Sequence, residues 1–70
     1  MSNGIQDEDI VVVRKVAAYE ISRFMNGSLD RLEGPYDRPT AEARAKALAQ
    51  EHQSDAWIQE FPTAVRLLED

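Results

Sequence analysis

The sequence predicts a single α+β domain: a three-stranded antiparallel meander, one helix packed on the sheet, and then one or two C-terminal strands. Three features of the chain predict this fold. Two stretches of strand-forming residues come first, an Asn26-Gly27 pair follows them, and an alanine-rich helical stretch precedes a last strand with two aromatic residues. The chain has 70 residues, which is enough for one domain only.

The first two strands are expected in residues 9–16 and 18–25. The first stretch, DIVVVRKV, is rich in β-branched residues, which favour strands. The second stretch, AYEISRFM, alternates between its two faces, as a half-buried strand does. Residues 16–18 then form the connection, although they include no glycine, proline, asparagine or aspartate to mark a turn.

Asn26-Gly27 is the strongest local signal in the chain. This pair tolerates the positive φ angles that a type I′ turn requires at both central positions. We therefore expect a tight hairpin that returns into a short, charged edge strand over residues 28–33. Gly34-Pro35 should end this strand, because proline cannot donate a hydrogen bond to a neighbouring strand.

A helix is expected over residues 41–53, with Thr40 after Pro39 as its N-cap. The stretch contains five alanines and almost no β-branched residues. Glu42 should lie in the first turn, where a negative charge suits the helix dipole, and should pair with Lys46 one turn later.

One stripe of this helix should face the sheet, since residues follow one another at about 100° around a helix. The stripe consists of Ala41, Ala45, Leu48, Ala49 and His52. Its small alanines let the helix lie close to the sheet, with Leu48 as the main anchor. His52 lies at the helix C-terminus, where a partial positive charge is favoured, so we interpret it as structural rather than catalytic.

The stretch DAWIQEF, residues 55–61, should return as a strand, with Trp57 and Phe61 on the same face. A break at Pro62 follows. Residues 64–69 are expected to form a final short strand, with a last helical turn as the alternative. The predicted core consists of Val11, Val13, Tyr19, Ile21, Ala45, Leu48, Trp57 and Ile58.

Residues 1–8 are polar and aperiodic, so we expect a disordered leader before a domain that spans residues 9–70. The leader has neither the basic nor the apolar region of a secretory signal. The longest apolar run, residues 10–13, is far too short to span a bilayer. Because the chain also lacks cysteine, we expect it in the reducing cytoplasm.

The sequence lacks the residue sets on which most catalytic and metal sites depend. With no cysteine and one histidine, disulfides and thiolate metal sites are excluded and a histidine site is disfavoured. No serine stands in a recognised nucleophile context, and the three glycines are too far apart to form a phosphate loop. We therefore expect no enzyme, and no catalytic, cofactor-binding or metal-binding residues.

The net charge of −5 comes from the two ends of the chain. Five of the 13 acidic residues lie at 7–9 and 69–70, which leaves eight acidic residues against eight basic ones in the body. A phosphate-binding surface normally shows a basic excess. Weak nucleic-acid binding, through basic residues of the meander and an aromatic stacking partner, is therefore the second choice.

The stretches VVVRKVAAYEISRF and GPYDRPTAEARAKALAQEH resemble a group of small bacterial domains of unknown function. In those domains a β-meander leads through a short polar turn into a helix that opens with Thr-x-Glu-Ala or a similar motif. The resemblance covers residues 9–61 and implies the same order of meander and helix. Because the group has no established activity, the resemblance implies nothing about function.

These observations favour a non-catalytic interaction or regulatory module. The candidate interaction surface consists of Trp57, Phe61, Arg14, Arg23 and Arg31. Exposed aromatic residues anchor interfaces, although the core is the simpler role for both aromatics in so small a chain. The expected partner is a protein, either a second copy in a homodimer or another chain, and not a membrane. A lone core of this size stabilises the fold by only about 3–5 kcal/mol, so either self-association or unusually good packing is needed.

Overall fold

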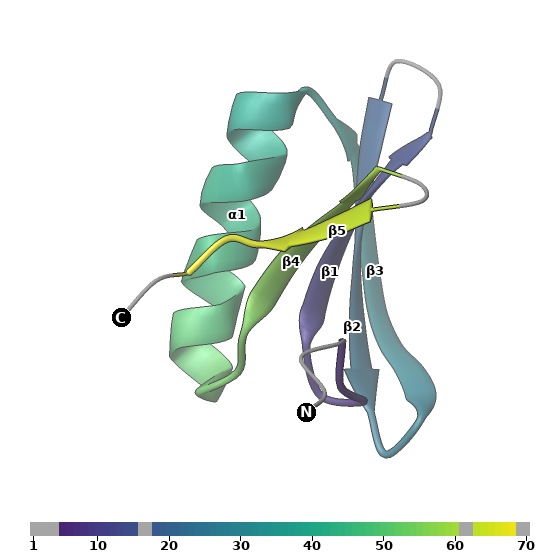
Figure 1. Ribbon diagram of the computed structural model, residues 1–70, viewed down its shortest axis with the longest axis vertical. Helices are drawn as coiled ribbons and strands as arrows, with labels where there is room; N and C mark the ends of the chain where they lie inside the picture. Colours follow the sequence, from purple (N-terminus) through teal and green to yellow (C-terminus); the bar gives the residue numbers. More distant parts are fainter. Residues whose placement is uncertain (1–4, 16–17, 61–62, 69–70) are drawn as a thin grey trace.

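The computed structural model describes residues 5–15, 18–60 and 63–68. Its elements are β1 (Ile10–Lys15), β2 (Ala18–Met25), β3 (Ser28–Tyr36), α1 (Arg38–His52), β4 (Ala56–Glu60) and β5 (Thr63–Arg66). The strands form a five-stranded sheet in the order β3-β2-β1-β4-β5, and α1 runs along one side of it (Figure 1). The predicted α+β class, the meander, the helix on the sheet and two C-terminal strands are confirmed.

The sheet is mixed, with β1 in its centre. β1 pairs antiparallel with β2, which pairs antiparallel with β3, while β4 lies parallel to β1 and antiparallel to β5. Parallel strands need a crossover connection. α1 supplies it, because it carries the chain from the edge strand β3 back across the sheet to the free side of β1.

The meander follows the prediction in its turn but not in the length of its third strand. Asn26 and Gly27 have φ angles of 54° and 81°, which confirms the predicted turn. The predicted end at Gly34-Pro35 is wrong, since β3 continues to Tyr36. Proline is tolerated there because β3 is an edge strand and the pairing is irregular between Tyr19 and Ile21 of β2. The Gly34–Pro35 peptide bond is cis.

The connections at the ends of these strands are described only in part. Residues 16–17 of the predicted first connection, and Phe61 and Pro62 before β5, lie outside the described residues. Ala18, at which the predicted connection and the predicted second strand overlap, is the first residue of β2. The predicted final strand is confirmed, although it spans Thr63–Arg66 rather than residues 64–69.

The helix begins three residues earlier than predicted. Its N-cap is Asp37, whose Oδ1 accepts a hydrogen bond from the backbone N–H of Thr40 at 3.0 Å. The assignment of Thr40 as the N-cap was therefore wrong. Pro39 lies in the first turn, where its missing N–H costs nothing because that amide would have no partner within the helix.

Two expectations about the charges of α1 change with this earlier start. Glu42 lies in the second turn rather than the first, and its ion-pair partner is Arg38, at 2.7 Å, rather than Lys46. The helix ends at His52, and Gln53 takes the left-handed φ of 56° that closes many helices.

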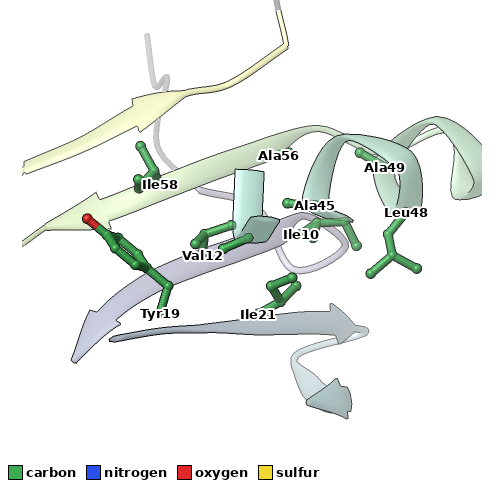
Figure 2. Packing of buried hydrophobic residues seen from close by; sticks show 10 residues of the cluster. Ile10, Val12, Tyr19, Ile21, Ala45, Leu48, Ala49, Ala56 and Ile58 are labelled. Atoms are coloured by element: carbon green, nitrogen blue, oxygen red, sulfur yellow. The ribbon is translucent and has the colours of Figure 1, made fainter. Parts of the chain in front are cut away.

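The core lies between α1 and the sheet, as Figure 2 shows. Its buried residues are Ile10, Val12, Tyr19, Ile21, Ala41, Ala45, Leu48, Ala49, Ala56 and Ile58. The four apolar members of the predicted helix stripe are all fully buried, whereas His52 at its end is exposed. Leu48 is therefore the one large side chain that the helix contributes to the buried cluster.

The core face of β1 is the opposite of the predicted one. Val12 pairs with Ile21 of β2, so Val12 faces the helix. Val11 and Val13, which alternate with it, point to the other side of the sheet, and so does Trp57, the pairing partner of Val11. Three of the eight predicted core residues therefore lie on the face that α1 does not cover, although Val11 is buried there, as predicted, with 4% of its surface exposed.

Glu33 connects the edge strand β3 to the helix. Arg44 of α1 donates to both of its carboxylate oxygens, at 2.9 and 3.1 Å, and the Tyr36 hydroxyl donates a third hydrogen bond at 3.2 Å. Arg31 adds an ion pair at 2.8 Å. The hydrogen bonds from Arg44 hold the pKa of Glu33 below its ordinary value of 4.5.

Acidification should therefore loosen the contact between β3 and α1. Because the pKa of Glu33 is lowered in the folded chain, its stabilisation is complete above about pH 4.5 and is lost as the pH falls through the folded pKa. In thermal melts from pH 7 to pH 3, a Glu33→Gln variant should lose less stability than the wild type. The exposed Glu8→Gln serves as control and should follow the wild type. Equal acid sensitivity of the Glu33→Gln variant and the wild type would contradict this prediction.

Candidate interaction surface

The sheet has a second face, because α1 covers only one side of it (Figure 1). The pairing partners across all five strands place one continuous row of side chains on this face: Leu32, Ser22, Val11, Trp57 and Arg66. Phe24 and Leu29 pair with each other beside this row, and Val13 lies on its other side. We call the six apolar residues Val11, Val13, Phe24, Leu29, Leu32 and Trp57 the open face.

Two leucines of the open face are unusually exposed. Leu29 and Leu32 expose 53% and 56% of their surface, although both lie within a strand. Three positions apart in a regular strand, they would point to opposite sides of the sheet. They point to the same side because the pairing shifts between Arg23 and Phe24, so that β3 has one extra residue there.

The middle of the open face is uncharged, and its polar groups lie at the rim. Arg66 ends the row on β5 and donates to Asp55, which precedes β4, at 2.9 Å. Glu20 and Gln59, the pairing partners of Val13, form the polar rim at the end of the open face next to Val13. An apolar centre with a polar rim is the usual anatomy of a protein interface.

Trp57 combines a large ring with an unsatisfied donor. It is half-buried on β4, next to the buried Val11, and its indole Nε1 has no hydrogen-bond partner among the described residues. A buried donor without a partner costs about 1–3 kcal/mol, because its hydration is lost without replacement. The packing of the ring, not its polar atom, is therefore what Trp57 contributes to the fold.

Replacing Trp57 with phenylalanine should change the free energy of unfolding by less than about 1 kcal/mol, since the lost packing area is offset by removal of the unpaired donor. Trp57→Ala should cost clearly more, about 2–4 kcal/mol for a half-buried ring. Urea unfolding followed by far-UV circular dichroism measures both variants, because Trp57 is the only tryptophan and fluorescence is lost with it. A phenylalanine variant as unstable as the alanine variant would show that Nε1 is satisfied.

The structure separates the residues that were predicted to form one interaction surface. Trp57 lies on the open face, whereas Arg14 and Arg23 pair with the core residues Tyr19 and Ile10 and so project from the side that α1 covers. Arg31 pairs with Arg23 and lies on that same side. The fifth residue, Phe61, lies outside the described residues.

Arg23 holds the β2–β3 hairpin against the end of the helix. It donates to the carboxylate of Asp30 through Nη2 and to Nε2 of His52 through Nη1. Its side chain is only 13% exposed, and its Nε is buried without a partner in the described part of the chain. Arg23 and His52 are therefore engaged in a contact within the domain.

Four other arginines also form ion pairs within the domain. Arg31 and Arg44 both pair with Glu33, and Arg38 pairs with Glu42. Arg66 pairs with Asp55 at the rim of the open face. Phosphate binding requires cations that are available to the ligand. The nucleic-acid alternative draws no support from this pairing.

The sequence did not point to Leu29 and Leu32 as surface residues. A strand pattern alone cannot assign Leu29 and Leu32 to one face, because the extra residue between them is a feature of strand pairing. The available signal was their position among charged residues in a predicted edge strand, where a leucine is more exposed than in the centre of a sheet.

Within residues 5–15, 18–60 and 63–68, no three histidine, aspartate or glutamate side chains come together in a way that could hold a metal ion. The same residues include no helix with the length and apolar character needed to cross a membrane.

Comparison with known proteins adds no relative. The chain matches no protein-family model, no curated protein and no solved structure. The resemblance of residues 9–61 to small bacterial domains of meander and helix stays a prediction.

Proposed function

We propose that this chain is a non-catalytic protein-interaction module that binds its partner on the open face and acts in the cytoplasm. The observation that carries the proposal is the exposure of Leu29 and Leu32, at 53% and 56%, beside Phe24 and Trp57 on one face of the sheet. Contiguous exposed apolar side chains with a polar rim are typical of protein-binding sites. The absence of cysteine supports the cytoplasmic location.

The face is a better candidate than the edges of the sheet. An edge strand binds a partner strand through its free backbone groups, which requires a long and regular edge. β3 is long, but its pairing is irregular at two places, and it contains Pro35. β5 has only four residues. Both edges therefore have features that oppose the addition of a partner strand. Binding on the open face does not depend on free backbone groups.

The chemistry of the open face favours a protein partner over a nucleic acid. Its exposed leucines and half-buried aromatic rings offer apolar surface without a formal charge, and the arginine at its rim, Arg66, is paired with Asp55. Burial of such apolar area drives protein association, whereas nucleic acids bind mainly through phosphate contacts with free cations.

Site-specific crosslinking tests the proposal. A photoreactive benzophenone amino acid is placed at Leu32 on the open face, and a control copy carries it at Val65. Val65 has nearly the same exposure, 58%, but pairs with the core residue Ile58 and so lies on the other side of the sheet. In the native cell, irradiation should yield a discrete crosslinked protein from position 32 and none from position 65. Equal patterns at both positions, or crosslinks to nucleic acid, would overturn the proposal.

A further inference from the structure

We infer that the occupant of the open face is a second copy of this chain, so that two sheets pack face to face around a twofold axis. This inference rests on the proposed function and names its partner. Three features of the open face support it: its width, its symmetry about β1 and its lack of uncompensated charge.

The width of the sheet calls for a partner of similar width. Stable interfaces bury about 800 Å² on each partner, which is roughly one sixth of the chain's 4628 Å² of accessible surface. Five strands spaced about 4.8 Å apart span about 24 Å, so that nearly the whole face must be covered to reach this area. An extended peptide covers only one or two strand widths. A second five-stranded sheet, packed about 10 Å away, covers all of them.

The order of the strands makes the face complementary to itself. β1 is the central strand, so a twofold axis along β1 places each row of side chains over the same row of the second copy, in reversed order. Val11 of β1, which is already buried in the single chain, then lies opposite its own counterpart. Trp57 of β4 faces Ser22 of β2, which sets the largest side chain of the row against the smallest. Large side chains opposite small ones give the interdigitation that close packing needs.

The ends of the row match as well. The same axis places β3 over β5, so that Leu32 lies against Arg66 of the second copy. An arginine can cover an apolar side chain with its aliphatic stem while its guanidinium stays at the rim. Here the guanidinium donates to Asp55, so that neither partner brings an unpaired charge of this row into the interface.

Sedimentation equilibrium of the full chain tests the inference directly. The wild type should dimerise with a dissociation constant in the micromolar range. Leu32→Lys should raise this constant by at least about 30-fold, because the twofold axis sets each of the two introduced ammonium groups against Arg66 of the second copy. Leu29→Glu is a second, independent variant on the same face and should act in the same direction. Val65→Lys, the control of matched exposure on the other side, should dimerise like the wild type.

The fluorescence of Trp57 gives a readout on the unmodified protein. As the only tryptophan, it should shift its emission to shorter wavelength as the wild type is concentrated through the dimer transition. Unchanged far-UV circular dichroism of each variant shows that it is folded. A wild type that stays monomeric up to about 1 mM overturns the inference, and so does a dimer that Val65→Lys weakens as much as Leu32→Lys does.

The crosslinks at position 32 distinguish a failure of the self-association from a failure of the proposed function. A crosslink to a second copy supports both. A crosslink to a different protein, together with a monomeric wild type, overturns the self-association and leaves the interaction module in place. No crosslink specific to position 32, again with a monomer, overturns both.

Discussion

Leu48→Ala is expected to lower the free energy of unfolding by about 2–5 kcal/mol, the usual cost of a fully buried leucine. Leu48 has no exposed surface and is the only large side chain through which α1 reaches the core, since its other buried residues are alanines. Alanine is the best helix former, so the substitution leaves the helix propensity intact and removes only packing. The measured loss is therefore the packing energy of the Leu48 side chain in the core.

A loss of this size is a large part of the total free energy of unfolding. Domains of this length are stable by only about 0.05–0.15 kcal/mol per residue. Urea unfolding by circular dichroism measures the effect, with Lys46→Ala on the exposed side of α1 as control, for which a change within about 0.5 kcal/mol is expected. Leu48→Met, which keeps most of the volume, should cost less than about 1.5 kcal/mol. A Leu48→Ala variant that unfolds like the wild type would contradict the helix orientation.

The parts of the fold that the sequence predicts are those that depend on neighbouring residues. Local signals predicted β2 to the residue, the turn at Asn26-Gly27 and the buried stripe of α1, because backbone preference and helical period act within a few residues. The start of the helix was predicted wrongly, because Thr40 is as good a cap as Asp37 and the local sequence does not decide between them. The hydrogen bond from Thr40 to Asp37 decides between them.

The core face of β1 could not be predicted from its own residues. Ile10 to Val13 is apolar on both faces, so the strand carries no alternation that could tell the covered side from the open one. Strand pairing decides which side of β1 faces the helix. Val12 lies opposite Ile21 of β2, a strand whose alternation marks its buried side. A strand with two apolar faces is suited to a sheet that is covered on both sides.

The open face depends on features that no local pattern contains. It needs the parallel pairing of β1 with β4, which joins residues 10–13 to residues 56–59, and it needs the extra residue of β3 between Leu29 and Leu32. Each of the candidate residues from the sequence was chosen for its chemical type. Only the pairing shows that Trp57 belongs with the leucines of β3 and that Arg14, Arg23 and Arg31 lie on the other side.

Gly34→Ala is expected to destabilise the fold about as strongly as the loss of Leu48, for a backbone reason. Gly34 has a φ of 127°, where residues with a side chain are strained by about 1–3 kcal/mol. An added Cβ would also lie 2.9 Å from the carbonyl oxygen of Tyr19 and 3.2 Å from the Cα of Glu20. Both are backbone atoms of β2 that cannot move without disturbing the sheet, which adds about 1–3 kcal/mol of overpacking.

Gly27→Ala separates the two parts of this cost. Gly27 also has a positive φ, 81°, but its added Cβ would meet only the side chain of Asp7, at 3.7 Å. It should therefore carry the backbone strain alone, about 1–2 kcal/mol. Urea unfolding of both variants should place Gly34→Ala well below Gly27→Ala in stability. If the two were equally stable, β2 would not approach β3 closely at Gly34.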